Sequence, residues 1–512
     1  MKIPPKPKMT GWYDVGQLAQ TGLKTFMSEM LGGMVDTRRF LALEDTGQGS
    51  VFDYSTVADF SFDYTGDTGD GWDSTYTMAY LLSSPRLTVN GDTLDRPHVL
   101  ILGGDEVYPV ASRDNYAQRL VWPFNQAARN LKQPRPLSDI FCVPGNHDWY
   151  DCLNTFYRRI CNDRWLGSFQ TRQKRSYYVL NLPNHWHIWS LDIQLKSEVD
   201  PSQRRFFKNA AQHLGPEDRI ILCSAEPPVV NGKSQPKGDL EFGLGLFEKM
   251  VEERGARIVA TLAGDTHNYQ RYEVERTTEA KTTYKQWKIV AGGGGAFLHP
   301  THSFPPPAPD ETPVECKKRY PEEADSRSLS LKLILFPFAN RSFAALLGAV
   351  HVFAFWGVEP GASYSNMPFT HPGPALWLLT LIGALTAMGH FRGKLALGFL
   401  HGLAQGWLAC TIWRWSHDLS LWPWLNVLAQ LVASSMVGGV LFGIYLWISL
   451  NVFRCHQNEA FSALQVADFK SFLRIKVQHD KAIVYAVGIG KIAGEEAAHP
   501  VPLKLVERFE IS

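Results

Sequence analysis

The chain has 512 residues, and its 51 Lys and Arg against 50 Asp and Glu leave a net charge of +1, which excludes the strong basic excess of a dedicated nucleic-acid binder. With 45% hydrophobic and 12% aromatic residues, it is too apolar for an intrinsically disordered protein. Its length predicts roughly two to four folding units, and seven cysteines without a Cys-x-x-Cys pair indicate reduced thiols in a cytosolic compartment rather than a disulfide framework.

The N-terminal half begins with a segment, residues 1–54, that carries Lys2, Lys6 and Lys8 but no apolar stretch behind them, so we expect no secretory signal. From residue 55 to 303, short β-rich runs alternate with helical patterns, which is typical of a layered α/β domain. The helical patterns lie at 74–83, 149–160, 201–213 and 240–254. The predicted strands are Ala58–Tyr64, His98–Leu102, Asp139–Val143, Tyr177–Leu180, His187–Leu191, Arg219–Cys223, Arg257–Leu262 and Trp287–Val290.

Four of these predicted strands lead into turns that carry polar side chains. In an open α/β sheet, ligands bind beyond the carboxyl ends of the strands, so we expect the four turns to converge on one site of oxygen and nitrogen donors. Glycines in the turns permit sharp bends and close approach of the backbone. In chain order the turns read Gly66-Asp67, Gly104-Asp105, Gly145-Asn146-His147-Asp148 and Gly264-Asp265-Thr266-His267.

This order of motifs resembles the calcineurin-like metallophosphoesterase superfamily over about residues 55–300, and Gly145-Asn146-His147-Asp148 is its most specific element. The resemblance implies an α/β sandwich with two metal ions at the strand ends. It also implies that Asp67 and His267 bind the first metal, that Asp105 bridges both metals, and that Asn146 binds the second.

The resemblance further implies that His147 contacts the substrate and acts as general acid near the leaving group, oriented by Asp148. An imidazole suits this role because its pKa lies near working pH. Two divalent cations would clamp a phosphoryl group and ionise a bridging water. Gly293, in a run of four glycines after the last predicted strand, and His299 are further candidates for substrate contact.

The sequence departs from the family pattern at three imidazole positions. The first motif reads Asp67-Thr68-Gly69 instead of Asp-x-His, with Asp70 next; Ala225 stands where the fourth motif has histidine, with Glu226 next; and Asp265 replaces the first histidine of the last motif. Because carboxylates stand at or beside each place, we expect an active, carboxylate-rich site that also uses Asp70, Glu226 and Asp265 as metal ligands. Such a site favours Mn²⁺, with Fe, Mg²⁺ and Zn²⁺ as the alternatives. A degenerate site is the competing interpretation.

The C-terminal half contains a region that is nearly free of charge. After a Pro-rich linker at 304–341, only five charged residues occur between 342 and 450. Each apolar run in it is near or above the ~20 residues that cross a hydrocarbon core, so we expect four transmembrane helices, with buried helices of a soluble domain as the alternative. The apolar runs are 342–358, 374–391, 395–413 and 424–450.

Basic residues set the expected orientation of these helices. Lys and Arg precede the first run and follow the fourth, Arg392 and Lys394 separate the second from the third, and the loop 359–373 has neither. By the positive-inside rule, the catalytic domain and both termini lie in the cytoplasm, in a multi-pass protein of the cell or inner membrane. Residues 451–512 are expected to be a small β-containing cytosolic tail with a hairpin of Phe472–Val477 and Ala482–Val487.

Two functions follow from these patterns. The first is a membrane-anchored dinuclear-metal phosphoesterase that hydrolyses a phosphoester or pyrophosphate. Four spans exceed what anchoring requires, which suits a lipid-linked substrate. The alternative is a membrane sensor or transport-associated protein whose degenerate phosphoesterase domain binds ligand without turnover. The expected partners are a phosphoester and the lipid bilayer, without nucleic acid.

Overall fold

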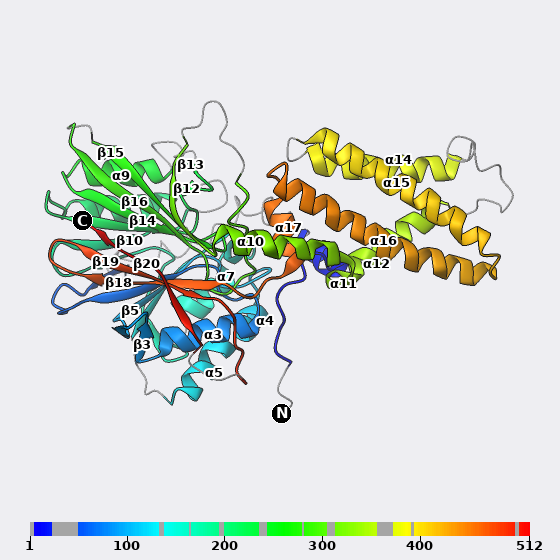
Figure 1. Cartoon of the computed structure of the whole chain (residues 1–512). Helices are drawn as coiled ribbons and strands as arrows, with labels where there is room; N and C mark the ends of the chain where they lie inside the picture. Colours follow the sequence, from blue (N-terminus) through cyan, green and yellow to red (C-terminus); the bar gives the residue numbers. More distant parts are fainter. Residues whose placement is uncertain are drawn as a thin grey trace.

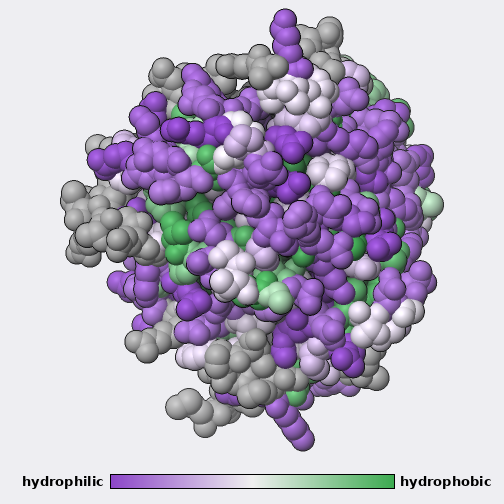
Figure 2. All heavy atoms as spheres, turned by 90° about the vertical axis from the view of Figure 1, so that its left-hand side faces the viewer, coloured by the Kyte–Doolittle hydropathy of each residue, from purple (hydrophilic) through white to green (hydrophobic). Residues whose placement is uncertain are grey.

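The computed structural model contains a β-sandwich and, beside it, a bundle of long helices (Figure 1). Residues 305–312 of the predicted linker 304–341, most of the loop 359–373, and Arg392 lie outside the described residues, whereas residues 313–341 of the linker are described and consist largely of a strand and short helices. The end of the sandwich that faces away from the helices is predominantly hydrophilic (Figure 2). The structure describes residues 5–22, 50–132, 138–162, 165–193, 199–234, 243–278, 281–304, 313–355, 372–390, 394–496 and 501–512.

The first of the two large sheets has eight strands in the order β1-β9-β10-β11-β14-β16-β15-β17. Its centre is parallel, and β15 and β17 add antiparallel strands at one edge. The strands are β1 (Val51–Asp53), β9 (Tyr178–Asn181), β10 (Trp186–Ser190), β11 (Arg219–Ser224), β14 (Arg257–Ala263), β15 (Tyr269–Thr277), β16 (Thr283–Ala291) and β17 (Cys316–Tyr320).

The second sheet also has eight strands, in the order β20-β19-β18-β2-β5-β6-β8-β7. Strands β2, β5, β6 and β8 run parallel, and β18 pairs antiparallel with β2. The strands are β2 (Ser61–Thr65), β5 (Val99–Gly103), β6 (Asp139–Val143), β7 (Trp165–Leu166), β8 (Phe169–Thr171), β18 (Lys470–Val477), β19 (Ala482–Ile489) and β20 (Leu503–Ile511).

Apolar side chains form a core between the sheets and a further cluster on each outer face. Phe62 and Ile101 of the second sheet and Leu180 and Ile221 of the first belong to one buried cluster. Helices cover the two outer faces, so the sheets are buried on both sides, as parallel sheets require. The helices are α3 (Trp72–Ser83) and α5 (Trp122–Asn130) on the second sheet, and α8 (Pro201–Ala211) and α9 (Leu244–Glu252) on the first. The predicted α/β sandwich is confirmed.

The local predictions agree with most of these elements. Strand β6 has the predicted bounds, and the other predicted strands lie within or overlap observed ones. The predicted helix 149–160 is broken, because Cys152 and Leu153 have left-handed backbone angles, φ 57° and 61°. It is replaced by three short helices, α6 (Asn146–Trp149), α7 (Asn154–Phe156) and the π-helix η3 (Tyr157–Cys161).

The C-terminal segment is not the separate tail that we expected. Its hairpin, β18 and β19, is present, but β18 pairs with β2 in register from Leu473 opposite Tyr64 to Lys476 opposite Ser61. Strand β20 then pairs with β19. The pairing is favourable because Leu473 and Ile475 enter the core between the sheets. Strands β18, β19 and β20 therefore belong to the sandwich.

The apolar region forms helices, of which two are long and apolar enough to cross a membrane: α15 (Leu395–Asp418) and α16 (Pro423–Asn451). A third span is present if the helical segments on either side of Asn340, bent by 64°, count as one. In α14, side chains are described only from Leu379 to Met388, a short apolar stretch. The described residues thus give two spans, or up to three, rather than clearly four. The remaining helices here are α10 (Glu323–Ser330), the 3₁₀-helix η4 (Leu331–Leu335), α11 (Phe336–Ala339), α12 (Arg341–Ala354), α14 (Pro372–His390) and α17 (Gln457–Leu464).

Candidate active site

The four polar turns meet at one edge of the sandwich, as the order of the strands predicts. Asp67 follows β2, Asp105 follows β5 and Asp265 follows β14, and each has a left-handed backbone, with φ of 59°, 48° and 65°. Aspartate tolerates this conformation better than most residues, and it turns the chain sharply at the strand end. A side chain at Gly145 would collide with Asp105, so glycine is needed for the turns to approach each other.

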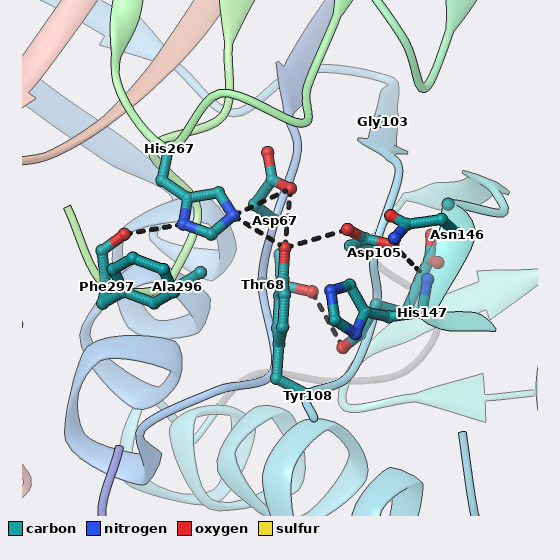
Figure 3. Close-up of polar contacts among 12 residues, drawn as sticks. Asp67, Thr68, Gly103, Asp105, Tyr108, Asn146, His147, His267, Ala296 and Phe297 are labelled. Atoms are coloured by element: carbon teal, nitrogen blue, oxygen red, sulfur yellow. Dashed lines mark hydrogen bonds and ion pairs between the residues drawn. The ribbon is translucent and has the colours of Figure 1, made fainter. Parts of the chain in front are cut away.

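The hydroxyl of Tyr108 lies at the centre of this site (Figure 3). It is 2.8 Å from Asp67 Oδ1, 3.0 Å from Asp105 Oδ2 and 3.0 Å from His267 Nε2. His267 Nδ1 donates to the Phe297 carbonyl at 2.7 Å, so in the neutral ring Nε2 carries a lone pair. One phenolic proton therefore faces three groups that accept.

Burial makes this arrangement electrostatically costly. It raises the pKa of both Asp67 and Asp105, and the neighbouring carboxylates raise them further. Burial lowers the pKa of His267, with His299 adding to the effect. The Oδ2 atom of Asp67 has no hydrogen-bond partner in the described structure. A cation at this point would compensate the carboxylates and engage the lone pairs.

The donor set therefore fits a divalent metal, although it is not preformed as a cage. Within the described ranges, no group of three or more His, Cys, Asp and Glu side chains has the arrangement of a metal site. The carboxylates of Asp67 and Asp105, the phenol of Tyr108 and the imidazole of His267 are oxygen and nitrogen donors of the kind that Mg²⁺, Mn²⁺ or Fe accept.

Three further predicted ligands lie near Asp105. Asn146 donates from Nδ2 to the Tyr150 hydroxyl at 3.1 Å. Asp265 lines the same cavity, and this recessed position raises its pKa, with His147 opposing the shift. Glu226 stands at the solvent-exposed rim, where partial desolvation and then the charges of Asp265 and Asp105 raise its pKa to about 7.

His147 is held by the backbone and not by Asp148. Its Nδ1 lies 2.6 Å from the Pro109 carbonyl, and its backbone N–H donates to Asp105 Oδ1 at 2.9 Å. Because the Pro109 carbonyl can only accept a hydrogen bond, Nδ1 carries a proton. The other ring nitrogen, Nε2, is therefore the one that can exchange a proton with a substrate.

Asp148 organises the loop instead, which corrects its expected role. Its carboxylate accepts from the backbone N–H groups of Gly145 at 2.9 Å and Glu106 at 3.1 Å, and from the Tyr116 hydroxyl at 2.6 Å. These bonds fix the turns that carry Asp105 and His147. The short helix α6 begins directly after Gly145, so the carboxylate caps it.

Two predicted site residues serve packing. Asp70 is fully buried, accepts from the backbone of Thr10 at 2.7 Å and lies 3.6 Å from Arg119 Nη1. Gly293 accepts from the backbone of Ser471 at 3.0 Å, and any larger residue would collide with that serine. Neither contact belongs to the converging turns.

His299 does lie at the site. Its ring stacks on His267 with centroids 4.0 Å apart, and burial lowers its pKa to about 4, so the ring is neutral. The sequence patterns did not identify Tyr108 as a site residue. The only feature that could have indicated it is its position three residues after Asp105, in the same turn. The patterns likewise did not identify Glu106, a fully buried acid behind Asp105 whose pKa burial and Asp148 raise.

The converging residues line a cavity of about 510 Å³. One wall comes from the sandwich and the other from the N-terminal segment and helix α17, which follows the long apolar helices α15 and α16. The sandwich wall consists of Asp105, Tyr108, Asn146, His147, Tyr150, Asp265, His267, Phe297 and His299, and the other wall of Trp12, Tyr13, Leu18, Asn458, Glu459 and Ser462.

Comparison with known proteins agrees with this geometry. Residues 60–269 match the sequence profile of the calcineurin-like phosphoesterases, whereas no curated protein sequence matches the chain. Among solved structures, a purple acid phosphatase, PPD1, from seeds of yellow lupin (Lupinus luteus) is 13% identical, with a TM-score of 0.31 over 50% of this chain and 48% of its own. PhoD is 11% identical, with a TM-score of 0.29 over 48% of this chain and 59% of its own. The chain thus spans about half the length of the solved structures that it matches. The match over residues 60–269 gives this chain a domain that is similar to the calcineurin-like phosphoesterases.

Proposed function

We propose that this protein is a membrane-anchored hydrolase that cleaves a phosphoester or pyrophosphate with the help of two divalent metal ions. The observation that carries the proposal is the hydroxyl of Tyr108, which faces Asp67, Asp105 and His267 with a single proton among them. Such a surplus of acceptors in a buried place is what a bound cation would compensate. His147 lines the same cavity.

We assign Asp67, Asp105, Tyr108 and His267 to a first metal, and Asp105, Asn146 and Asp265 to a second. When bound, divalent ions supply charge to neutralise a phosphate and to lower the pKa of water. The chain's own residues do the rest: the Pro109 carbonyl accepts from Nδ1 of His147, so that the doubly protonated ring can give its Nε2 proton to the leaving oxygen, and Asp148 keeps the supporting turn in place. Phe297 holds His267 in the tautomer that binds metal.

Carboxylates in place of imidazoles support Mn²⁺ as the best activator, with weaker activity in Mg²⁺ and poor activity in Zn²⁺. The test uses the purified full chain stripped of metal, reloaded with each ion and assayed on p-nitrophenyl phosphate and bis-p-nitrophenyl phosphate. Mn²⁺-dependent release of nitrophenol supports the proposal. The absence of turnover on both esters with every ion contradicts it and favours a domain that only binds ligand.

We also propose four membrane crossings with both termini in the cytoplasm. Strands before the helical region and strands after it share one sandwich, so both must lie on one side of the membrane and the number of crossings between them must be even. This supports two or four crossings over three. A reporter active only outside the cytoplasm should be silent when fused after Ser512 and active when inserted in the loop 359–373. Activity after Ser512, or silence in the loop, contradicts this topology.

A further inference from the structure

The active-site cavity is built jointly by the phosphoesterase sandwich and by the segments that attach it to the membrane helices. Helix α17, which supplies Asn458, Glu459 and Ser462 to the cavity, begins at Gln457, shortly after α16 ends at Asn451. The N-terminal segment completes this wall and contributes Trp12, Tyr13 and Leu18 to the cavity lining. Figure 1 shows both at the junction of the sandwich and the bundle.

The N-terminal segment is fixed on the sandwich before it reaches the cavity. The backbone carbonyl of Pro7 accepts from Trp72 at 3.0 Å, that of Lys8 accepts from Arg119 at 3.0 Å, and the backbone of Thr10 donates to Asp70. These contacts deliver Trp12 to the cavity, where its ring lies edge-on to His147, with centroids 5.8 Å apart.

The next residue of this segment ties the cavity wall to the membrane helices. Tyr13 is buried against Phe336, Phe343 and Phe442, with ring centroids 5.1, 5.1 and 5.9 Å away. Its hydroxyl donates to the backbone carbonyl of Glu459 at 3.1 Å. The two membrane-side parts of the wall are therefore joined to each other.

The sandwich meets the end of the last span at the same place. Ser303 donates to the carbonyl of Leu450 at 2.6 Å, and the backbone N–H of Leu298 donates to Val466 at 3.0 Å. Leu298, Leu446, Leu450 and Phe461 belong to a single apolar cluster. The cavity thus lies near the C-terminal end of α16, where a membrane-spanning α16 would leave the bilayer at the level of the lipid headgroups.

The cavity is lined by both polar and apolar side chains. His147, Asp105 and Asp265 are polar, as are Asn458, Glu459 and Ser462, whereas Trp12, Leu18 and Phe297 offer apolar surface. Leu18 is 43% exposed, and the indole N–H of Trp12 has no acceptor among the described residues. A small hydrophilic phosphoester would leave the apolar surface wet, whereas an apolar chain would cover it.

We infer that the substrate is an amphiphile of the membrane, a lipid phosphoester whose phosphate lies at Asp105 and His147 and whose apolar part lies on Trp12 and Leu18. This inference rests on the proposed hydrolase function. It makes the N-terminal segment a determinant of specificity, because Trp12 and Leu18 contact the part of the substrate that does not react.

The test measures inhibition of p-nitrophenyl phosphate hydrolysis by alkylphosphonates from methyl to octyl, with the full chain in lipid nanodiscs. Each methylene that is buried should lower Ki by about threefold to fourfold until the apolar surface is covered. Trp12→Ala and Leu18→Ser should flatten this dependence on chain length. Trp422→Ala is the matched control, since Trp422 is 74% exposed and lies outside the cavity lining.

The outcomes separate the two proposals. A Ki independent of chain length in the unmodified protein overturns the inference, as does an unchanged slope in both cavity variants. No hydrolysis of either p-nitrophenyl phosphate or bis-p-nitrophenyl phosphate with any metal overturns the proposed function itself. Faster cleavage of a diacylglycerol phosphate in vesicles than of p-nitrophenyl phosphate supports the lipid as the source of the phosphate, and Trp12→Ala should reduce that advantage by about tenfold.

Discussion

Arg474 donates two parallel hydrogen bonds to Asp63, from Nε to Oδ1 at 2.8 Å and from Nη2 to Oδ2 at 2.7 Å, although the two residues are 411 positions apart in the sequence. Both side chains are buried between β18 and β2, and the remaining nitrogen of Arg474 donates to the carbonyls of Leu94 and Asp95. Burial raises the pKa of Asp63 even beside this guanidinium, which indicates how large the desolvation cost is.

The ion pair predicts a large effect from a single substitution and a small one from a double substitution. Arg474→Met leaves Asp63 buried without a partner and should lower the free energy of unfolding by about 3–5 kcal/mol. Adding Asp63→Leu should restore most of the loss. Denaturant unfolding in detergent measures both. The surface pair of Lys481 and Glu510, 2.9 Å apart, is the control, and Lys481→Met should cost less than about 1 kcal/mol.

Tyr108→Phe tests the centre of the site. Removal of the hydroxyl deprives Asp67, Asp105 and His267 of their shared contact and removes one donor, so metal affinity should fall by about 10–100-fold. Isothermal titration with Mn²⁺ measures the affinity without reference to turnover. Tyr157→Phe, which removes a buried hydroxyl bonded to Ser176, should leave it unchanged. Equal affinity in Tyr108→Phe and the unmodified protein would remove Tyr108 from the metal site.

His147→Ala should separate proton transfer from metal binding. With Nδ1 held by Pro109, the ring serves the leaving group through Nε2, so turnover should fall by about 10²–10⁴ while metal content stays nearly constant. The loss should be smaller on p-nitrophenyl phosphate than on phenyl phosphate, whose leaving group needs a proton more. Asp148→Asn should instead lower metal content too, because Asp148 holds the turns. Equal losses of His147→Ala on both esters would contradict the acid role.

A fall in pH should weaken the contact between the sandwich and the helical bundle at His302. Burial lowers the pKa of His302 to about 4, and its ring lies 2.7 Å from Ser326 Oγ and 3.2 Å from Asn451 Oδ1. The unfolded chain binds this proton near pH 6.5, so the contribution of His302 to stability is complete above that pH and is lost as the pH falls towards 4. The melting temperature should drop over this range, and less in His302→Gln, which takes up no proton. Parallel profiles for the two proteins would exclude His302 as the source.

Patterns within one strand or one turn were enough to predict the sandwich and the turns that meet at its edge. The apolar runs ending at Leu102 and Val143 identify parallel neighbours in one sheet, whose following residues meet at one edge, and the run ending at Leu262 belongs to the facing sheet, whose turn at Gly264 comes close to Gly66. The hairpin near residue 480 was equally visible. Its pairing with β2 was not, because pairing over hundreds of residues leaves no local pattern.

Side-chain roles were harder to predict than positions. Asp148 follows His147 in sequence, yet the short helix α6 turns its carboxylate towards Gly145 and away from the imidazole. Tyr108 looks like any buried aromatic until its hydroxyl is placed among the carboxylates. Asp70 is one residue out of the family pattern, and its bond to Thr10 depends on the path of a segment with no periodicity of its own.

The pairing of β18 with β2 also determines when the second sheet can be completed during synthesis of the chain. Strand β2 ends at Thr65 and β18 begins at Lys470, so at about 5–20 residues per second the ribosome needs roughly 20–80 s to supply the missing neighbour. During that time the edge of β2 that later pairs with β18 is open. The sandwich therefore becomes complete only after the helices between these strands have been synthesised, and a chain released early would expose an unpaired strand edge to chaperones and proteases.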